Sequence, residues 1–259
     1  MTDHSTNSNS EAWTQEYRER GYVKLTGVFS SSEMDAVRAD FDRIFDNPEI
    51  LREDSLRAAS RKSLISGTVL DRLDPIIDLS PVIRELTQDH RVVTAAAQAI
   101  GEDALLFKDK AIMKPPGAFG YGVHQDFTNW QELPVPPQLL LSILVPIDSA
   151  TAENGALQCY PGLHHDHLRT PEKPTDIFNP KAGLVDEEML GDVQPELIEV
   201  NSGDLVLFSS LTPHCSGPNE SDRKRRTLFL SYSAARFGDV YEQYYENFYG
   251  YLAKDRNQM

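Results

Sequence analysis

The sequence contains little cysteine, little positive charge and no long apolar run. Its two cysteines, Cys159 and Cys215, are too few for a disulfide framework. No stretch approaches the roughly 18 consecutive apolar residues of a membrane-spanning helix, and residues 1–10 lack the apolar core of a signal peptide. With 25 Lys and Arg against 40 Asp and Glu, the net charge is −15. These features predict a protein of the reducing cytoplasm that has neither nucleic acid nor a membrane as its main partner.

The remaining composition is that of an ordinary globular protein. Hydrophobic residues make up 40% and charged residues 25% of the 259 positions, which is typical of a chain that buries a substantial core. Residues 1–10 are rich in Ser, Thr and Asn and are predicted to form a disordered tail. Residues 11–259 contain no convincing linker and no internal repeat, which predicts a single domain.

Helical signals dominate the N-terminal part of the chain. Helices are expected over residues 13–20, 30–45 and 81–100, with one strand at 22–25. Ser30 and Glu33 have the spacing of a capping box, in which each side chain satisfies the other residue's backbone N–H. Gly101 is a typical helix stop. The charged segment 50–75 is ambiguous.

The second half of the chain is rich in strand signals. Strands are predicted at residues 104–113, 138–148, 156–160, 196–200, 204–209 and 226–233, followed by an aromatic helix at 240–251 that would pack on the core or on a second subunit. The long acidic segment 168–195, together with 50–75, is predicted to cover a substrate. Helices followed by strands favour a mainly β fold with flanking α-helices. A double-stranded β-helix, the jelly roll or cupin-like barrel, is the expected form.

The most informative pattern is His124-Gln125-Asp126 followed by a distant His214. Two imidazoles and one carboxylate are the ligands of a facial triad, which holds non-haem Fe(II) and leaves three coordination positions open. On a strand, residues i and i+2 point to the same face, so His124 and Asp126 can reach one metal while Gln125 faces away, unless the strand bends. His-x-Asp alone is common, and its simplest interpretation is a surface turn or a hydrogen-bonded histidine.

A basic run follows the distal histidine. Arg225 lies eleven residues after His214, and a planar guanidinium can bind a carboxylate of a second, dicarboxylate cofactor through two parallel hydrogen bonds. Arg226 is the alternative anchor, because strand alternation lets only one of the two arginines point inward. The spacing from His214 favours Arg225. The whole run 223–226 would otherwise be a solvated basic turn or an anion-binding patch.

Several further motifs accompany this pattern in a consistent order. They are Lys114-Pro115-Pro116, then Asn154-Gly155-Ala156-Leu157 with Pro161-Gly162-Leu163-His164, then Gly203-Asp204, and finally His214-x-Ser216-x-x-Asn219-x-Ser221-x-x-x-Arg225. Over about residues 20–235 the chain thus resembles the phytanoyl-CoA dioxygenase family of Fe(II)/2-oxoglutarate-dependent oxygenases. Leu163 departs from the serine that the family often carries, and the family's aromatic residue near Leu144 is missing.

The resemblance implies a set of residue roles within a single oxygenase domain. His124, Asp126 and His214 would bind iron and form the catalytic centre. Arg225 and Ser216 would bind the distal carboxylate of 2-oxoglutarate, with Gln125 and Lys110 near this cosubstrate. With O2, the enzyme would hydroxylate or otherwise oxidise an unactivated C–H of a small organic metabolite and release succinate and CO2. From their position after the motif, the residues predicted to line the substrate pocket are Phe127, Asn129 and Trp130.

Alternatives remain at this point. The tract His164-His165-Asp166-His167 offers four metal-binding side chains, but it follows a Pro-Gly turn and is interpreted as a loop at the barrel rim. A cupin-type metalloenzyme that does not use 2-oxoglutarate, or a non-catalytic small-molecule binding protein, would suit the same barrel. The negative net charge argues against a coenzyme A ester and favours an amino-acid-like, phosphonate or secondary-metabolite substrate.

Overall fold

The computed structural model describes residues 4–50, 57–63, 67–168 and 184–256. The helices are α1 (His4–Arg20), α2 (Ser31–Phe45), α3 (Pro81–Gln88), α4 (His90–Ile100), α5 (Glu187–Leu190) and α6 (Tyr241–Arg256). The strands are β1 (Tyr22–Leu25), β2 (Ala58–Ser63), β3 (Gly67–Leu73), β4 (Ala104–Lys114), β5 (Tyr121–His124), β6 (Leu140–Pro146), β7 (Leu157–Cys159), β8 (Glu196–Ile198), β9 (Leu205–Ser209), β10 (His214–Ser216) and β11 (Arg225–Ala234).

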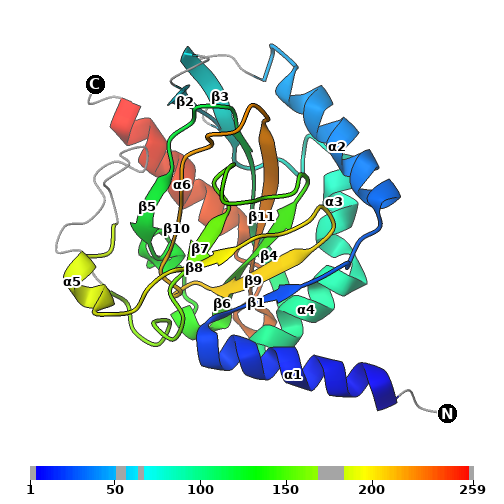
Figure 1. The fold of residues 1–259 in the computed structure, drawn as a ribbon, viewed down its shortest axis with the longest axis vertical. Coiled ribbons are helices and arrows are strands. Elements are labelled where there is room, and N and C mark those ends of the chain that lie inside the picture. Colours follow the sequence, from blue (N-terminus) through cyan, green and yellow to red (C-terminus); the bar gives the residue numbers. More distant parts are fainter. Residues whose placement is uncertain (1–3, 51–56, 64–66, 169–183, 257–259) are drawn as a thin grey trace.

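The strands form two antiparallel sheets (Figure 1). The larger sheet has the order β1-β9-β6-β11-β4-β3-β2, and the smaller one has the order β5-β10-β7-β8. Neighbours in the sheets are mostly distant in the sequence, so segments far apart along the chain are brought side by side. The predicted mainly β architecture with flanking helices is therefore confirmed. Among the described residues, no helix combines the length and the apolar character needed to cross a membrane.

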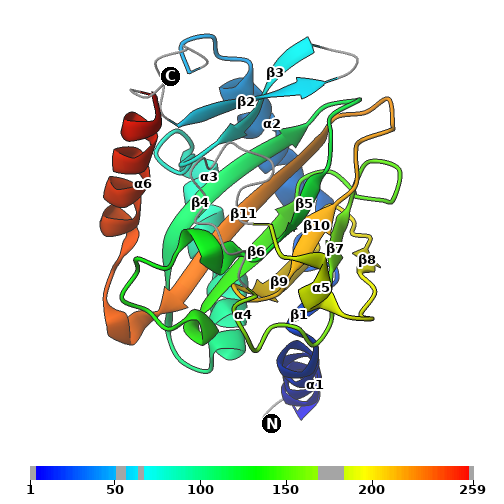
Figure 2. The same ribbon diagram turned by 90° about the vertical axis from the view of Figure 1, so that its left-hand side faces the viewer.

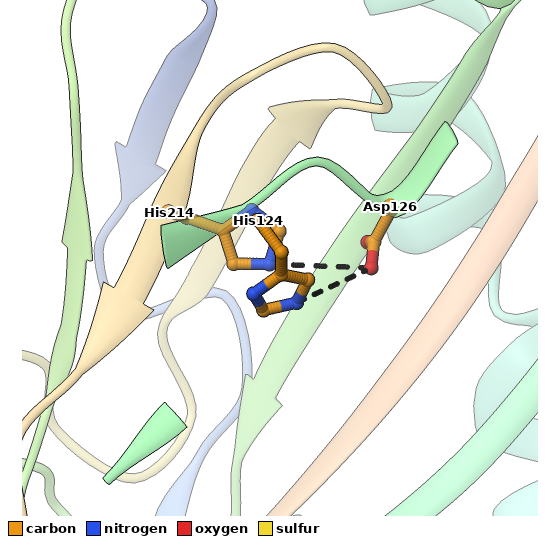
Figure 3. Close-up of side chains that lie close together, drawn as sticks. All are labelled: His124, Asp126 and His214. Carbon is orange, nitrogen blue, oxygen red and sulfur yellow. Dashed lines mark ion pairs between the residues drawn. The ribbon is translucent and has the colours of Figure 1, made fainter. Parts of the chain in front are cut away.

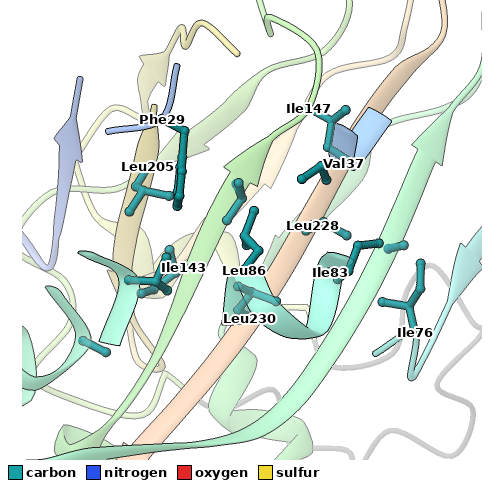
Figure 4. Packing of buried hydrophobic residues seen from close by; sticks show 14 of the residues in the cluster. Phe29, Val37, Ile76, Ile83, Leu86, Ile143, Ile147, Leu205, Leu228 and Leu230 are labelled. Atoms are coloured by element: carbon teal, nitrogen blue, oxygen red, sulfur yellow. The ribbon is translucent and has the colours of Figure 1, made fainter. Parts of the chain in front are cut away.

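Strand alternation gives the larger sheet two different faces. On β6, Leu141 and Ile143 join the apolar core shared with α2, α3 and α4, whereas Ser142 and Leu144 point to the other side, toward the smaller sheet. Figure 4 shows this packing of helix and strand side chains. The predicted capping box at Ser30 is present at the start of α2. Helices α2, α3 and α4 thus cover one face of the larger sheet, and the opposite face is open toward the smaller sheet, where a site can form.

The C-terminal helix α6 lies beside β4 (Figure 2) and packs on the core, where it covers a group of polar side chains. Tyr245 donates a hydrogen bond from its hydroxyl to Asp74 at 2.9 Å. Lys108 forms an ion pair with the same carboxylate at 3.0 Å, and both charged side chains are almost fully buried. Asp74 and Lys108 therefore form a buried ion pair beside β4.

Three expectations need correction or fall outside the described chain. Helix α1 begins at His4, within the predicted tail, since no proline or glycine in residues 4–10 interrupts a helix and Ser and Asn reduce helix propensity only modestly. The ambiguous segment contributes the antiparallel pair β2 and β3, whose charged residues mask the strand pattern. The prediction that 168–195 covers the substrate falls largely on residues 169–183, outside the described residues.

Candidate metal centre

His124, Asp126 and His214 come together between the two sheets (Figure 3). His214 on β10 is paired directly with His124 on β5. The Nε2 atoms of the two histidines lie 3.9 and 4.0 Å from Asp126 Oδ1. These separations lie within the span of two metal–ligand bonds of roughly 2.1 Å each. Among the described residues, these three are the group with metal-ligand spacing, so two imidazoles and one carboxylate can reach one ion.

Asp126 differs from the prediction in its local structure. Strand β5 ends at His124, and Asp126 is the first residue of a short 3-10 helix over Asp126–Asn129. Gln125 between them keeps an extended backbone with φ −113° and ψ 131°, so the alternation that directs both ligands to one side persists past the last strand hydrogen bond. Ser142 Oγ then donates a hydrogen bond to Asp126 Oδ2 at 2.7 Å and fixes the carboxylate.

Backbone carbonyls set the tautomer of both histidines. His124 Nδ1 lies 2.9 Å from Gly122 O, and His214 Nδ1 lies 2.9 Å from Thr212 O. A carbonyl oxygen only accepts hydrogen bonds, so each Nδ1 carries the proton and each Nε2 presents its lone pair toward Asp126. This is the usual outer-shell arrangement of metal-binding histidines.

Burial also favours the protonation states that a metal requires. Burial is the main cause of the lowered pKa of both His124 and His214, and the His124 imidazole lowers the pKa of His214 further. Burial opposes the charge of Asp126, but His214, Lys110 and His124 outweigh it and hold the pKa of this carboxyl below its usual range. Near neutral pH the site therefore holds two neutral imidazoles and one carboxylate, ready to bind a cation without releasing protons.

The triad opens into a cavity between the sheets. Its walls come from β4, β6 and β11 of the larger sheet and from β5, β7 and β10 of the smaller one. Arg225, 6% exposed, lies in this wall with Ser216. Arg226 points the other way and forms an ion pair with Asp148 at 2.7 Å. Strand alternation thus directs the two arginines to opposite faces, and Arg225, which its spacing from His214 favoured, lines the cavity.

Two glycine-containing turns hold the Arg225 region together. The Arg225 guanidinium donates a hydrogen bond to Gly155 O. Gly155 has φ +72°, and a Cβ there would lie 2.6 Å from Lys114 Nζ and 2.4 Å from Gly217 O, so only glycine fits. Asn219, fully buried, donates from its side chain to Lys114 O at 2.9 Å and closes the turn before β11. The sequence motifs around residues 154 and 219 therefore position the basic end of the cavity.

Comparison with known proteins agrees with this geometry. The sequence profile of the phytanoyl-CoA dioxygenase (PhyH) family matches residues 17–227. The chain belongs to the phytanoyl-CoA dioxygenase family. It is 31% identical over 240 residues to the methylphosphonate hydroxylase of Gimesia maris, covering 93% of this chain and 85% of that protein. It is 26% identical over 235 residues to a 2-aminoethylphosphonate dioxygenase of an uncultured bacterium, HF130_AEPn_1, covering 90% of this chain and 84% of the relative.

Solved structures share the fold of this family member. The crystal structure of EctD from S. alaskensis with 2-oxoglutarate and 5-hydroxyectoine matches with a TM-score of 0.72 at 22% identity, covering 86% of this chain and 75% of that one. The epimerase SnoN in complex with Fe3+, alpha ketoglutarate and nogalamycin RO matches with a TM-score of 0.71 at 22% identity, covering 88% and 85%. At these identities the likeness establishes the shared fold.

Gln125 does not lie at the cavity, contrary to the role that the family resemblance implied. It is fully buried, and its side-chain amide donates to Asp166 O at 2.9 Å and to Leu211 O. Its amide oxygen accepts from Leu168 N at 2.7 Å. Strand alternation turns it away from the two ligands. In this phytanoyl-CoA dioxygenase family member, Gln125 therefore ties the loop 164–168 to the centre of the fold.

Replacing Gln125 with the similarly shaped methionine should lower stability without affecting cosubstrate binding. Three backbone groups, those of Leu211 in a buried and of Asp166 and Leu168 in partly buried hydrogen bonds, would lose their partner, which is expected to reduce the free energy of unfolding by about 1–3 kcal/mol. Urea denaturation measures this loss, and the KM for 2-oxoglutarate should stay within about twofold of the wild-type value. A large rise in that KM at unchanged stability would instead restore Gln125 to the cosubstrate site.

The predicted substrate-pocket residues Phe127, Asn129 and Trp130 do not line the cavity. Trp130, 3% exposed, packs edge-on against Phe107 at 4.9 Å between ring centroids. Phe127 contacts the ring of His167 at 5.1 Å, and Asn129 is exposed. The 3-10 helix that begins at Asp126 turns these side chains away from the metal centre, and the sequence pattern does not reveal such a turn.

The cavity wall also contains residues that the sequence analysis did not predict. Tyr121 and Phe229 line the wall. Phe229 could have been found from the sequence, because it is four residues from Arg225 on one strand and shares that strand's inward face. Tyr121 lies three residues before His124, so alternation alone would place it on the other face, and the register shift between β5 and β10 at this point is not visible in the sequence. Lys110 lies in the wall as well; its predicted place near the cosubstrate stays a prediction. The tract 164–167 lies apart from the metal group, with His164 Nε2 3.1 Å from Arg18 O.

Proposed function

We propose that this protein is an Fe(II)- and 2-oxoglutarate-dependent dioxygenase. It would hydroxylate, or otherwise oxidise, a C–H bond of a small organic metabolite and release succinate and CO2. The observation that carries the proposal is the joint presence, in one cavity, of the triad His124, Asp126 and His214 and of the inward-facing Arg225. We also infer that the two facing sheets form the double-stranded β-helix, or jelly roll, that the sequence predicted.

Each residue has a distinct part in this proposal. His124 Nε2, His214 Nε2 and a carboxylate oxygen of Asp126 would hold Fe(II) on one side and leave its other positions toward the cavity. The iron, with 2-oxoglutarate, supplies the oxidising chemistry when bound. Arg225 would bind the distal carboxylate of the cosubstrate with two parallel hydrogen bonds, and Ser216 Oγ would add a third. Ser142 holds the Asp126 carboxylate in place.

The relatives support a small substrate. Two of them are named for activity on methylphosphonate and 2-aminoethylphosphonate, and each covers most of this chain. The cavity wall also contains apolar side chains, Ile112, Leu144 and Leu157, that can enclose a short carbon chain beside the triad. We therefore infer a compact metabolite in place of a long acyl-coenzyme A.

Metal removal tests the proposal directly. Protein purified without oxygen and supplied with Fe(II), ascorbate, 2-oxoglutarate and O2 is expected to form succinate slowly even without a primary substrate. Treatment with a chelator should abolish the succinate, and added Fe(II) should restore it. Turnover that depends on the metal but not on 2-oxoglutarate would favour a cupin-type metalloenzyme. Ligand binding with neither dependence would favour a non-catalytic binding protein.

A further inference from the structure

Lys114 is a buried lysine at the anchor end of the cavity, and the proposed function gives it no part. It is the last residue of β4 and is in register with Arg225 on β11. Residues in register share a face of the sheet, so the two cations lie on the same side. Lys114 is only 1% exposed. Burying an ammonium group is costly unless hydrogen bonds compensate it, so its contacts indicate what it does there.

The ammonium group of Lys114 contacts the segment that contains Ser216. Its Nζ donates a hydrogen bond to Ser216 Oγ at 3.1 Å and another to the backbone carbonyl of Gly217. The missing side chain of Gly155 leaves room for this group, since a Cβ there would lie 2.6 Å from Nζ. Asn219 donates to the backbone carbonyl of Lys114 at 2.9 Å. Lys114 is thus fixed against the turn that follows β10.

The charge of Lys114 sets the direction of its hydrogen bond with Ser216. An ammonium group has three donors and no acceptor, whereas a hydroxyl group has one donor and two acceptor lone pairs. Ser216 Oγ therefore accepts from Lys114, and it also accepts from the backbone N–H of Tyr121 at 3.4 Å. These two contacts occupy the lone pairs of the oxygen and leave its proton to be donated. Because Ser216 lines the cavity, that proton can reach a ligand there.

A carboxylate is the ligand that suits this end of the cavity. An ionised carboxylate only accepts hydrogen bonds, and hydrogen bonds to a charged acceptor are roughly twice as strong as those between neutral groups. Arg225, in the same wall as Ser216, can only donate. The ammonium charge behind Ser216 also polarises its hydroxyl, because linked hydrogen bonds strengthen each other in a low-dielectric site. Lys114, Ser216 and Arg225 together favour an anionic oxygen over a neutral group.

We propose that Lys114 is a positioning residue for the cosubstrate: it holds Ser216 as a hydrogen-bond donor to the distal carboxylate and thereby helps to select a dicarboxylate. The proposal rests on the proposed function, because it assumes that 2-oxoglutarate places this carboxylate beside Arg225. Lys114 acts through Ser216 in this arrangement. Without the ammonium group, the Ser216 hydroxyl is free to rotate and to donate to other acceptors, among them the carbonyl of Gly217 that has lost its own donor.

A double-mutant cycle of Lys114→Met and Ser216→Ala tests this dependence. Calorimetric titration with 2-oxoglutarate, in the presence of Fe(II) but without O2, measures binding independently of turnover. Each single variant is expected to weaken the binding by about tenfold or more. The double variant should bind within about threefold of Ser216→Ala, because the effect of Lys114 requires the hydroxyl. The affinity for 2-oxovalerate, which has the same carbon chain without the distal carboxylate, should be equal in wild type and variants.

Lys24→Met is the matched control for Lys114→Met. Lys24 is an exposed lysine that likewise donates to a backbone carbonyl, that of Glu199, at 3.1 Å, and its replacement should leave the affinity for 2-oxoglutarate unchanged. If Lys114→Met does not fold, Lys114→Gln replaces it in the cycle with the same expectations, because it removes the charge but keeps a donor for Gly217 O.

Three outcomes would overturn the role of Lys114. They are an unchanged affinity for 2-oxoglutarate in Lys114→Met, losses that multiply to about 100-fold in the double variant, and an equal weakening of 2-oxovalerate, which would indicate a general distortion of the cavity. Failure of the proposed function is distinguishable from these, because the wild-type protein would then neither bind 2-oxoglutarate nor form iron-dependent succinate.

Discussion

Replacing Asp126 with alanine is expected to abolish iron binding and succinate formation while the protein stays folded. Asp126 is the single carboxylate of the triad, and its oxygen faces both histidine Nε2 atoms. Loss of an outer-shell partner of a metal ligand already costs 10–100-fold in affinity or activity, so loss of the ligand itself should cost more than about 100-fold. The melting temperature of the metal-free variant should fall only modestly: the favourable interactions of the carboxylate outweigh its burial cost, and Ser142 loses its hydrogen-bond partner.

Ser142→Ala provides the graded comparison for this variant. It removes the hydrogen bond that orients the Asp126 carboxylate but leaves all three metal-binding side chains in place. Its iron affinity, measured by anaerobic equilibrium dialysis, is expected to fall about tenfold, with succinate formation retained at saturating iron. Stoichiometric iron in Asp126→Ala would show that the ion binds elsewhere and would remove the triad from the proposed mechanism.

The ligands could be predicted from the sequence because strand geometry controls them. The spacing of two residues between His124 and Asp126 places both on one side even though the strand ends at the first of them. The same rule predicted that Gln125 faces away from the metal ligands, whereas the family resemblance implied a place near the cosubstrate. In the structure Gln125 faces away and binds the loop 164–168. Alternation likewise required that only one of Arg225 and Arg226 point inward, and the spacing from His214 favoured Arg225. For Gln125, where strand alternation and the family resemblance disagreed, the prediction from alternation was the one that the structure supports.

Features that depend on turns and on long-range pairing could not be predicted. Trp130 follows the metal motif in the sequence, but a 3-10 helix sends it into a separate aromatic core with α6. The strand β3 adds Arg72 next to the cavity only because it pairs with β4 across a long separation in sequence. Charged residues in that segment obscured its alternation. Such positions are decided by tertiary contacts, which leave no local pattern to read.

Arg225→Ala and Arg226→Ala are expected to have opposite effects although the residues are adjacent. Arg225 is buried in the cavity wall and is the proposed partner of the cosubstrate's distal carboxylate. Truncating one member of a buried charge pair costs about 2–5 kcal/mol, so the KM for 2-oxoglutarate should rise by about 30-fold or more. Arg225→Lys keeps the charge but loses the two parallel hydrogen bonds, and an intermediate rise of about tenfold is expected.

Arg226→Ala should instead destabilise the fold and leave the KM for 2-oxoglutarate nearly unchanged. Arg226 lies on the opposite face of β11, where it pairs with Asp148 and with Asp42 on α2. Its removal leaves Arg38 as the remaining ion-pair partner of Asp148 and Lys224 as that of Asp42. The expected loss is therefore about 1–2 kcal/mol, less than for a fully buried pair because the Asp42 side chain is 33% exposed. Urea denaturation and 2-oxoglutarate titration of both variants give four measurements.

If Arg226→Ala were the variant with the raised KM, the inward-facing arginine would be misassigned and the cosubstrate would have to bind on the helix side of the sheet. That outcome would conflict with a metal centre on the opposite face, so the pair of variants tests the anchor and the geometry of the site together.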